Sequence, residues 1–407
     1  MTERLVASDW PRLVRGLYLT AMAVFLVTIT IGILNGADVI AFNHDQILTH
    51  VHSGTLGWIT LSIVAAAAWF ARGIDRSLAI ALAAIIPIYV AAFYLANPTL
   101  REIVGGILLI AILWLVVWSW QMAIRRPSLP ALAIALGLTT FTYGAVIGVL
   151  RQVQLAGGPN FFPATADIVG AHASAMVFSY LILVAMGLLE WQIIGTTGRP
   201  RAGLAQVLAL FAGGIIISGA LLFLPVEAQQ VPGGLYLLVQ LIAVAIFAVR
   251  VVPTAIRIDW SRATARRHFG AASVYVILAT VVFLIVIYKF IADPSIAADP
   301  TPVLGILTAS DHAAFIGVIT NLMLGLLAVL TADRPDRWPW AGQVVFWGVN
   351  LGLLVFIAGL VGGIVIVKEI GAPIMGIALL FGLAVAADRL WRSDLGAALG
   401  SPSAADA

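Results

Sequence analysis

The sequence predicts an all-α integral membrane protein with about twelve transmembrane helices. Two properties of the 407 residues predict this class: 62% are hydrophobic and only 10% are charged, and the mean hydropathy is +1.06. Soluble domains are close to half apolar and about a quarter charged. The whole chain, 1–407, is therefore expected to form a single transmembrane domain in a lipid bilayer.

Twelve apolar segments have the length of roughly 20 residues that spans a bilayer. They cover about 16–34, 49–70, 77–96, 102–124, 129–150, 168–190, 202–224, 233–252, 270–291, 303–330, 341–362 and 372–390. A Gly362-Gly363 break and a polar turn at 368–376 precede the last of them. The small, polar residues 396–407 are typical of a disordered tail.

The basic residues orient these segments. Eighteen of the 22 Lys and Arg fall in one set of alternate connections, and the other set holds only Arg101, Arg151, Lys289 and Lys368. By the positive-inside rule both termini are expected in the cytoplasm. The excess of basic residues behind the net charge of +3 is therefore explained by membrane topology. No nucleic-acid partner is expected. His268, in the basic connection 253–268, is expected to face solvent or lipid headgroups.

Histidine is the main candidate for chemistry in this chain. Cysteine is absent, which excludes disulfides, thiolate-ligated metals and Cys-attached haem. Three of the six histidines, His52, His172 and His312, open apolar segments, and the intervals are 172 − 52 = 120 and 312 − 172 = 140 residues. The orientation places them at one depth near the outer leaflet. The recurrence indicates three four-helix repeat units, about 16–124, 129–252 and 270–390.

A histidine at membrane depth is costly unless it has a partner, so each is a functional candidate. The alternative is a helix-start histidine that bonds to a loop or to interfacial water. Haem suits the pattern, because an iron porphyrin between two helices takes one imidazole from each and needs small flanking residues. His50 and His52 diverge by about 200° on a helix, so they face different sites unless the helix end unwinds. His44 is expected on a surface loop.

Several acidic residues and tryptophans have structural explanations. Asp167 and Asp311 are expected to cap the sixth and tenth helices. No acidic residue is expected deep within a span. Most tryptophans are expected in an interfacial aromatic belt, and Trp58 is also a candidate to line a porphyrin pocket.

The twelve-helix pattern, the cytoplasmic termini and the histidines on helices two, six and ten together resemble the catalytic subunits of haem–copper oxidases and nitric oxide reductases. The stretch His50-Val-His52-Ser-Gly-Thr-Leu-Gly-Trp58 is similar to the second-helix motif of NnrS-type haem and copper membrane proteins. This resemblance implies a haem b held by His50 or His52 together with His312. It implies a copper ligand at His172, with His52 and His312 as further metal-ligand candidates. Arg151 and Lys368 are candidates to bind the haem propionates.

The chain differs from that family in the histidines that would form the oxygen-reducing haem–copper centre. The seventh helix has no histidine, and Asp311-His312 replaces a His-x-His pair. A complete oxygen-reducing centre is therefore not expected, and no catalytic residue is assigned. The resemblance implies a protein of the bacterial inner membrane that acts in electron transfer, nitric oxide metabolism or metal handling, with an unidentified redox partner or respiratory subunit. A transporter or channel with a histidine metal or proton site is one alternative, and a non-catalytic assembly subunit is another.

Overall fold

The computed structural model describes residues 9–195, 198–293, 296 and 301–395. All regular secondary structure within these ranges is helical. Twelve helical spans in these ranges are long and apolar enough to cross a membrane, so the chain is a multi-pass membrane protein of the predicted all-α class. The tail predicted at 396–407 lies outside the described residues.

The chain divides into two compact units. Unit 1 comprises Met1–Leu17 and Ile63–Val251, and unit 2 comprises Tyr18–Ser62 and Val252–Ala407. The helices α2 (Trp10–Gly36) and α4 (Leu61–Ala71) contribute to both. This division describes how the helices pack. It does not test the three predicted repeats, which concern similarity along the sequence and stay a prediction.

Unit 1 is built around α7 and α10. Besides the shared helices it contains α5 (Arg76–Tyr94), α6 (Pro98–Arg125), α7 (Leu129–Leu155), α8 (Ile168–Ser174), η2 (Ala175–Leu181), α9 (Ile182–Ile193), α10 (Arg201–Phe223), η3 (Val226–Ala228) and α11 (Gln230–Arg250). The segments α8, η2 and α9 form one continuous span. α7 packs along all three of them, and α10 packs against α8, η2 and α11.

Polar side chains cap several of these helices. Asp75, Asn97 and Ser128 begin α5, α6 and α7 by accepting hydrogen bonds from backbone amides of the first turn. Such caps satisfy amides that have no partner inside the helix. The chain can therefore start each span next to a short polar connection.

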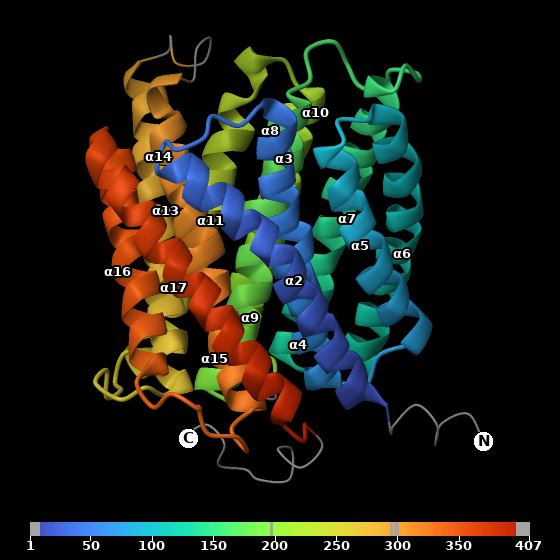
Figure 1. The fold of residues 1–407 in the computed structure, drawn as a ribbon. Helices are drawn as coiled ribbons and strands as arrows, with labels where there is room; N and C mark the ends of the chain where they lie inside the picture. Colours follow the sequence, from blue (N-terminus) through green and yellow to red (C-terminus); the bar gives the residue numbers. More distant parts are fainter. Residues whose placement is uncertain (1–8, 196–197, 294–295, 297–300, 396–407) are drawn as a thin grey trace, which may run out of the picture. The chain divides into compact units, whose positions relative to one another are not determined.

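Unit 2 contains the remaining helices. They are α3 (His44–His52), η1 (Ser53–Thr60), α12 (Val252–Ala255), α13 (Ala265–Ala292), α14 (Thr301–His312), η5 (Ala313–Thr320), α15 (Asn321–Leu330), α16 (Ala341–Gly362) and α17 (Val365–Arg392). The segments α14, η5 and α15 form one continuous span. α13 packs along all three of its segments, and α14 also packs against α16 (Figure 1).

The close pairing of α16 and α17 corrects one predicted boundary. Gly363 adopts the left-handed conformation (φ 64°) that ends α16, so the chain reverses within a few residues. α17 therefore starts at Val365, and the polar turn predicted at 368–376 is helical. A Cβ on Gly352 would lie 2.5 Å from the backbone nitrogen of Met375. Small residues thus let the two backbones nearly touch, as is typical of membrane helices.

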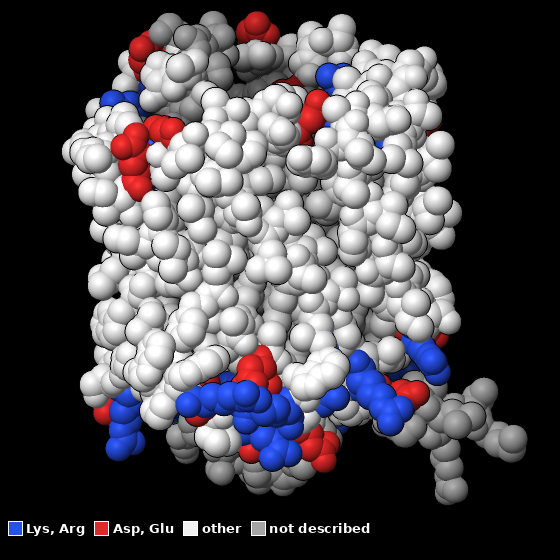
Figure 2. All heavy atoms as spheres, in the orientation of Figure 1, with Lys and Arg blue, Asp and Glu red and all other residues white. Residues whose placement is uncertain are grey.

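The outer face of α17 is suited to lipid. Ile366, Ile370, Ile374 and Ile377 recur at helical spacing and are all exposed. Figure 2 shows uncharged side chains over the middle of α17 and basic side chains gathered over its C-terminal end. An apolar stripe with charges confined to the helix end fits a hydrocarbon layer bordered by headgroups.

Candidate functional site

His50 is held against α2 within unit 2. Its Nδ1 lies 2.9 Å from the carbonyl oxygen of Thr28. One helical turn further along α2, a Cβ on Gly32 would lie 3.0 Å from Cε1 of the His50 ring. The imidazole therefore packs onto a glycine, and a carbonyl fixes its orientation.

His172 has the same arrangement within unit 1. Its Nδ1 lies 2.8 Å from the carbonyl oxygen of Gly144 on α7. Four residues later on the same helix, a Cβ on Gly148 would lie 2.9 Å from Cε1 of His172. His50 and His172 are therefore structural equivalents, each held by a carbonyl and a glycine one turn apart on the preceding long helix.

His52 and His312 form a second equivalent pair. Their Nδ1 atoms lie 2.8 Å from the carbonyl oxygens of Leu48 and Thr308, each four residues earlier in the same helix. His172 therefore corresponds to His50 rather than to His52, from which the sequence interval of 120 residues is counted. His172 matches His50 because both rings bond to a neighbouring helix, which residue intervals alone do not reveal.

Serines occupy the remaining positions that correspond to His50 and His52 on the other two spans. Ser310, two residues before His312, donates to the carbonyl oxygen of Ala279 on α13 at 3.1 Å. It thus repeats the bond that His50 makes to α2. By position, Ser174 follows His172 as His52 follows His50. Each of the three helices has two comparable positions, and histidine occupies four of the six.

A π-helical segment follows each histidine position. η1 starts at Ser53, η2 at Ala175 and η5 at Ala313. The hydroxyls of Thr60 and Thr320 donate to carbonyls five residues earlier, at 2.8 and 2.9 Å, which is the π-helical spacing. Such segments are rare and are frequently found at functional sites.

His50 and His312 lie on two spans of unit 2 whose π-helical segments, η1 and η5, pack against each other. The His312 ring also contacts Phe356, with centroids 4.9 Å apart. The η1 and η5 segments are joined further along by a hydrogen bond from Trp58 Nε1 to Thr320 Oγ1 at 3.0 Å. Trp58 is fully buried and stacks on Phe25, so it does not belong to an interfacial belt.

The hydrogen bonds define the histidine tautomers. A carbonyl oxygen can only accept, so Nδ1 carries the proton in His50 and His312 when they are neutral, and Nε2 carries the lone pair. A metal-ligating histidine typically has this form, with the second ring nitrogen held by a carbonyl. Both rings are also half-buried. In each ring Nε2 is therefore the nitrogen that is able to coordinate a metal.

The other predicted site residues lie elsewhere. His172 belongs to unit 1, whereas His50, His52 and His312 belong to unit 2. Within the described ranges, no three His, Asp or Glu side chains form a group that could hold a metal ion. Arg151 donates to Gln154 Oε1 at 2.7 Å. Lys368 forms an ion pair with Asp38 at 2.8 Å, and this hydrogen bond lowers the pKa of the Asp38 carboxyl.

Two expectations about polar side chains are wrong and one is confirmed. Asp167 caps α8 by accepting from the amide of Gly170 at 2.8 Å, as predicted. Asp311 does not cap a helix, because α14 already starts at Thr301 and places Asp311 inside the span. His44 is the first residue of α3 rather than part of a loop, although it is exposed as expected.

His268 is buried, contrary to the expectation that it faces solvent or headgroups. α13 starts at Ala265 and carries His268 inward. Its Nδ1 lies 3.1 Å from Asn321 Oδ1, and Asn321 Nδ2 donates to Asn350 Oδ1 at 3.0 Å. An imidazole and two amides therefore form a hydrogen-bonded cluster among α13, α15 and α16.

Glu190 was also missed as a buried acid. It lies near the end of α9 with no exposed surface, and it forms an ion pair with Arg250 of α11. Arg250 also donates to Gln206 Oε1 at 3.1 Å. The sequence signal was available: a single glutamate at the end of one apolar run and a single arginine at the end of another can pair across helices.

No family model matches the chain, and no curated protein matches it. The fold and these side chains define the class as a multi-pass, all-helical membrane protein in which histidine rings are fixed by backbone carbonyls.

Proposed function

We propose that the chain is a haem-binding membrane protein that holds a b-type haem through His50 and His312 of unit 2 and takes part in electron transfer. The observation that carries this proposal is the pair itself. The two imidazoles come from two spans of unit 2 whose η1 and η5 segments pack against each other, and each has Nδ1 bonded to a carbonyl, so that Nε2 is the coordinating atom. When bound, the haem would supply a one-electron iron couple.

The protein's part in this function is to orient the ligands and exclude water. The carbonyls of Thr28 and Thr308 fix the two ring orientations, and Gly32 leaves room for the His50 ring. Fixed imidazoles bind iron without first losing rotamer freedom. His52 is the alternative partner of His312, and His50 is favoured because its ring is held by a second helix.

The resemblance to haem–copper oxidases and NnrS-type proteins suggests roles for three further residues. His172 would serve a second metal, such as copper, in unit 1. Lys368 would bind a propionate of the haem in unit 2. Arg151 belongs to unit 1 and would bind a propionate only of a haem held there. Lys368 would then have to exchange or share its ion pair with Asp38.

The test is a reduced-minus-oxidised optical spectrum of the purified full-length protein from haem-replete cells, with metal analysis of the same sample. His50→Ala and His312→Ala should each abolish or shift a b-type signal. His44→Ala is the matched control, because His44 is exposed on the same helix, and it should leave the signal unchanged. His52→Ala distinguishes the two candidate partners. A folded wild-type sample without haem or metal would overturn the proposal.

The proposal also includes a bacterial inner-membrane location with both termini in the cytoplasm. The location rests on the resemblance, and the orientation rests on the basic residues at alternate connections. Because the chain has no cysteine, single cysteines can report the topology. Ser261→Cys and Asn160→Cys lie at exposed positions in connections of opposite predicted side. A membrane-impermeant maleimide added to intact spheroplasts should label Asn160→Cys only, and the reverse pattern would contradict the topology.

A second candidate function is proton- or cation-coupled transport, and the position of Asp311 favours it. This half-buried carboxyl lies inside a span directly before His312, and ionisable groups at such depth often mark ion pathways. Proteoliposomes would separate the candidates. Cation-dependent uptake that is lost in Asp311→Asn, from a protein without haem, would support transport.

A further inference from the structure

Arg267 is a buried cation near the start of α13. Only 1% of the residue is exposed. Its guanidinium donates to Gln343 Oε1 at 2.7 Å and to the carbonyl oxygen of Gly342, and it lies 4.4 Å from the centroid of the Phe346 ring. All of these partners are uncharged.

The charge of Arg267 has no counter-ion in the described part of the chain. No acidic side chain there forms an ion pair with it. Its Nε is buried and has no hydrogen-bond partner among the same residues. A buried charge without a compensating charge is strongly unfavourable. The surroundings of Arg267 therefore lack the negative charge that would balance its guanidinium group.

A cavity of about 70 Å³ adjoins this side chain in unit 2. Its polar lining consists of Thr264, Arg267, His268, Thr331, Asp336 and Arg389. Liquid water occupies about 30 Å³ per molecule, so the cavity admits a small group. It lies between the first turns of α13 and the last turns of α17, near the helix ends where a bilayer places its headgroups.

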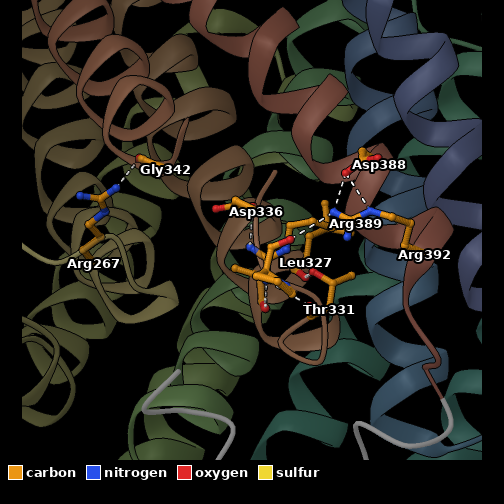
Figure 3. Close-up of polar contacts among 10 residues, drawn as sticks. Arg267, Leu327, Thr331, Asp336, Gly342, Asp388, Arg389 and Arg392 are labelled. Carbon is orange, nitrogen blue, oxygen red and sulfur yellow. Dashed lines mark hydrogen bonds and ion pairs between the residues drawn. The ribbon is translucent and has the colours of Figure 1, made fainter. Parts of the chain in front are cut away.

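Arg389 adds a second guanidinium to the cavity wall. It pairs with Asp336 at 3.3 Å and donates to the carbonyl oxygens of Ala328 and Thr331 at 3.2 and 3.1 Å (Figure 3). Its Nε is also buried and without a partner among the described residues. The cavity thus has two guanidinium groups and one carboxylate, which leaves one positive charge unbalanced.

We propose that this cavity is a phosphate-binding site, in which Arg267 supplies the unbalanced charge and the free Nε–H donor. Guanidinium groups and threonine hydroxyls are the donors that phosphate oxygens favour. The phosphate could come from an anionic lipid headgroup or from solution, because both present negatively charged phosphate oxygens. This inference is independent of the proposed haem site.

The experiment measures the thermal unfolding midpoint of the full-length protein in nanodiscs. In phosphatidylcholine discs, inorganic phosphate is titrated against chloride at equal ionic strength. In a second arm, phosphatidylglycerol replaces part of the phosphatidylcholine. A rise of about 2–4 °C in either arm is expected. A rise with phosphatidylglycerol alone identifies a headgroup, and a rise with inorganic phosphate identifies a soluble anion.

Variants assign the response to the cavity. Arg267→Gln should abolish the rise, whereas Arg262→Gln, an exposed arginine in the preceding connection, should keep it. Because Arg267→Gln could impair folding, Ala386→Leu serves as a second variant, since Ala386 lines the cavity and the change fills it while both arginines stay. No rise in either arm for the wild type, or a full rise in Ala386→Leu, would overturn the proposal.

Discussion

The indole of Trp58 donates its Nε1 hydrogen to Oγ1 of Thr320 at 3.0 Å. This bond joins two π-helical segments that are 262 residues apart in sequence, and both side chains are buried. We expect Trp58→Phe to lower the free energy of unfolding by about 1–2 kcal/mol, because a buried acceptor loses its donor. Unfolding in mixed detergent would measure this. Trp391→Phe, at an exposed position, is the control and should change nothing.

The glycines beneath the histidine rings should be sensitive to a single methyl group. Gly32→Ala would bring a Cβ to 3.0 Å from His50 Cε1, so the ring must move. We expect a shifted or weakened haem spectrum. Gly16→Ala, on the same helix with open space around its Cβ, should leave the spectrum as in the wild type. Identical spectra in both variants would show that the His50 ring is not a ligand.

The buried pair in unit 1 should be costly to break. Glu190→Ala removes the carboxylate that pairs with Arg250 and leaves a partly buried cation. We expect a loss of about 3 kcal/mol of unfolding free energy, since removing one partner of a buried pair costs more than removing both. The double variant Glu190→Gln, Arg250→Gln should recover part of that loss. If it is as unstable as Glu190→Ala, the pair itself is not the cause.

The ion pair between Asp38 and Lys368 should make stability depend on acid pH. The hydrogen bond from the Lys368 ammonium lowers the pKa of Asp38 below its ordinary value of 3.8. Because the pKa of Asp38 is lower in the folded state than in the unfolded state, the ion pair stabilises the protein fully at pH values above the unfolded-state pKa. This stabilisation is lost as the pH falls through the folded-state pKa. Melting curves from pH 7 to pH 3 should therefore show a steeper loss in wild type than in Asp38→Asn. Lys368→Met should match Asp38→Asn.

The number of spans and the helical class could be predicted because both follow from the length and hydropathy of the apolar runs. Several boundaries could not. α3 starts at His44 because Asn43 and Gln46 form a reciprocal capping box, a signal readable in the sequence as Asn-x-x-Gln. The last span was predicted to start at about 372, but α17 starts at Val365 because the left-handed turn at Gly363 is so short. The glycine pair in the sequence indicates a turn but does not give its geometry.

The candidate site was predicted in its residue types but not in its arrangement. His50, His172 and His312 were found because histidine is rare in apolar runs. Which histidines are structurally equivalent depends on the backbone carbonyl to which each ring bonds. Every residue has such a carbonyl, so the sequence does not identify the acceptor. The burial of His268 was missed because its neighbours Arg266 and Arg267 made the segment resemble a surface loop. Arg267 itself is buried by contacts with a helix about 75 residues later in the chain.

The alternation of histidine and serine at the two equivalent positions suggests how the chemistry of this fold can be varied. Ser310 already directs its hydroxyl to the same kind of carbonyl that holds His50. A single substitution, Ser310→His, would give α14 two imidazoles in the spacing that the second span already accommodates. The helix backbone thus accommodates either side chain at these positions, so the number of imidazoles on the three spans can change without a change in the helical bundle.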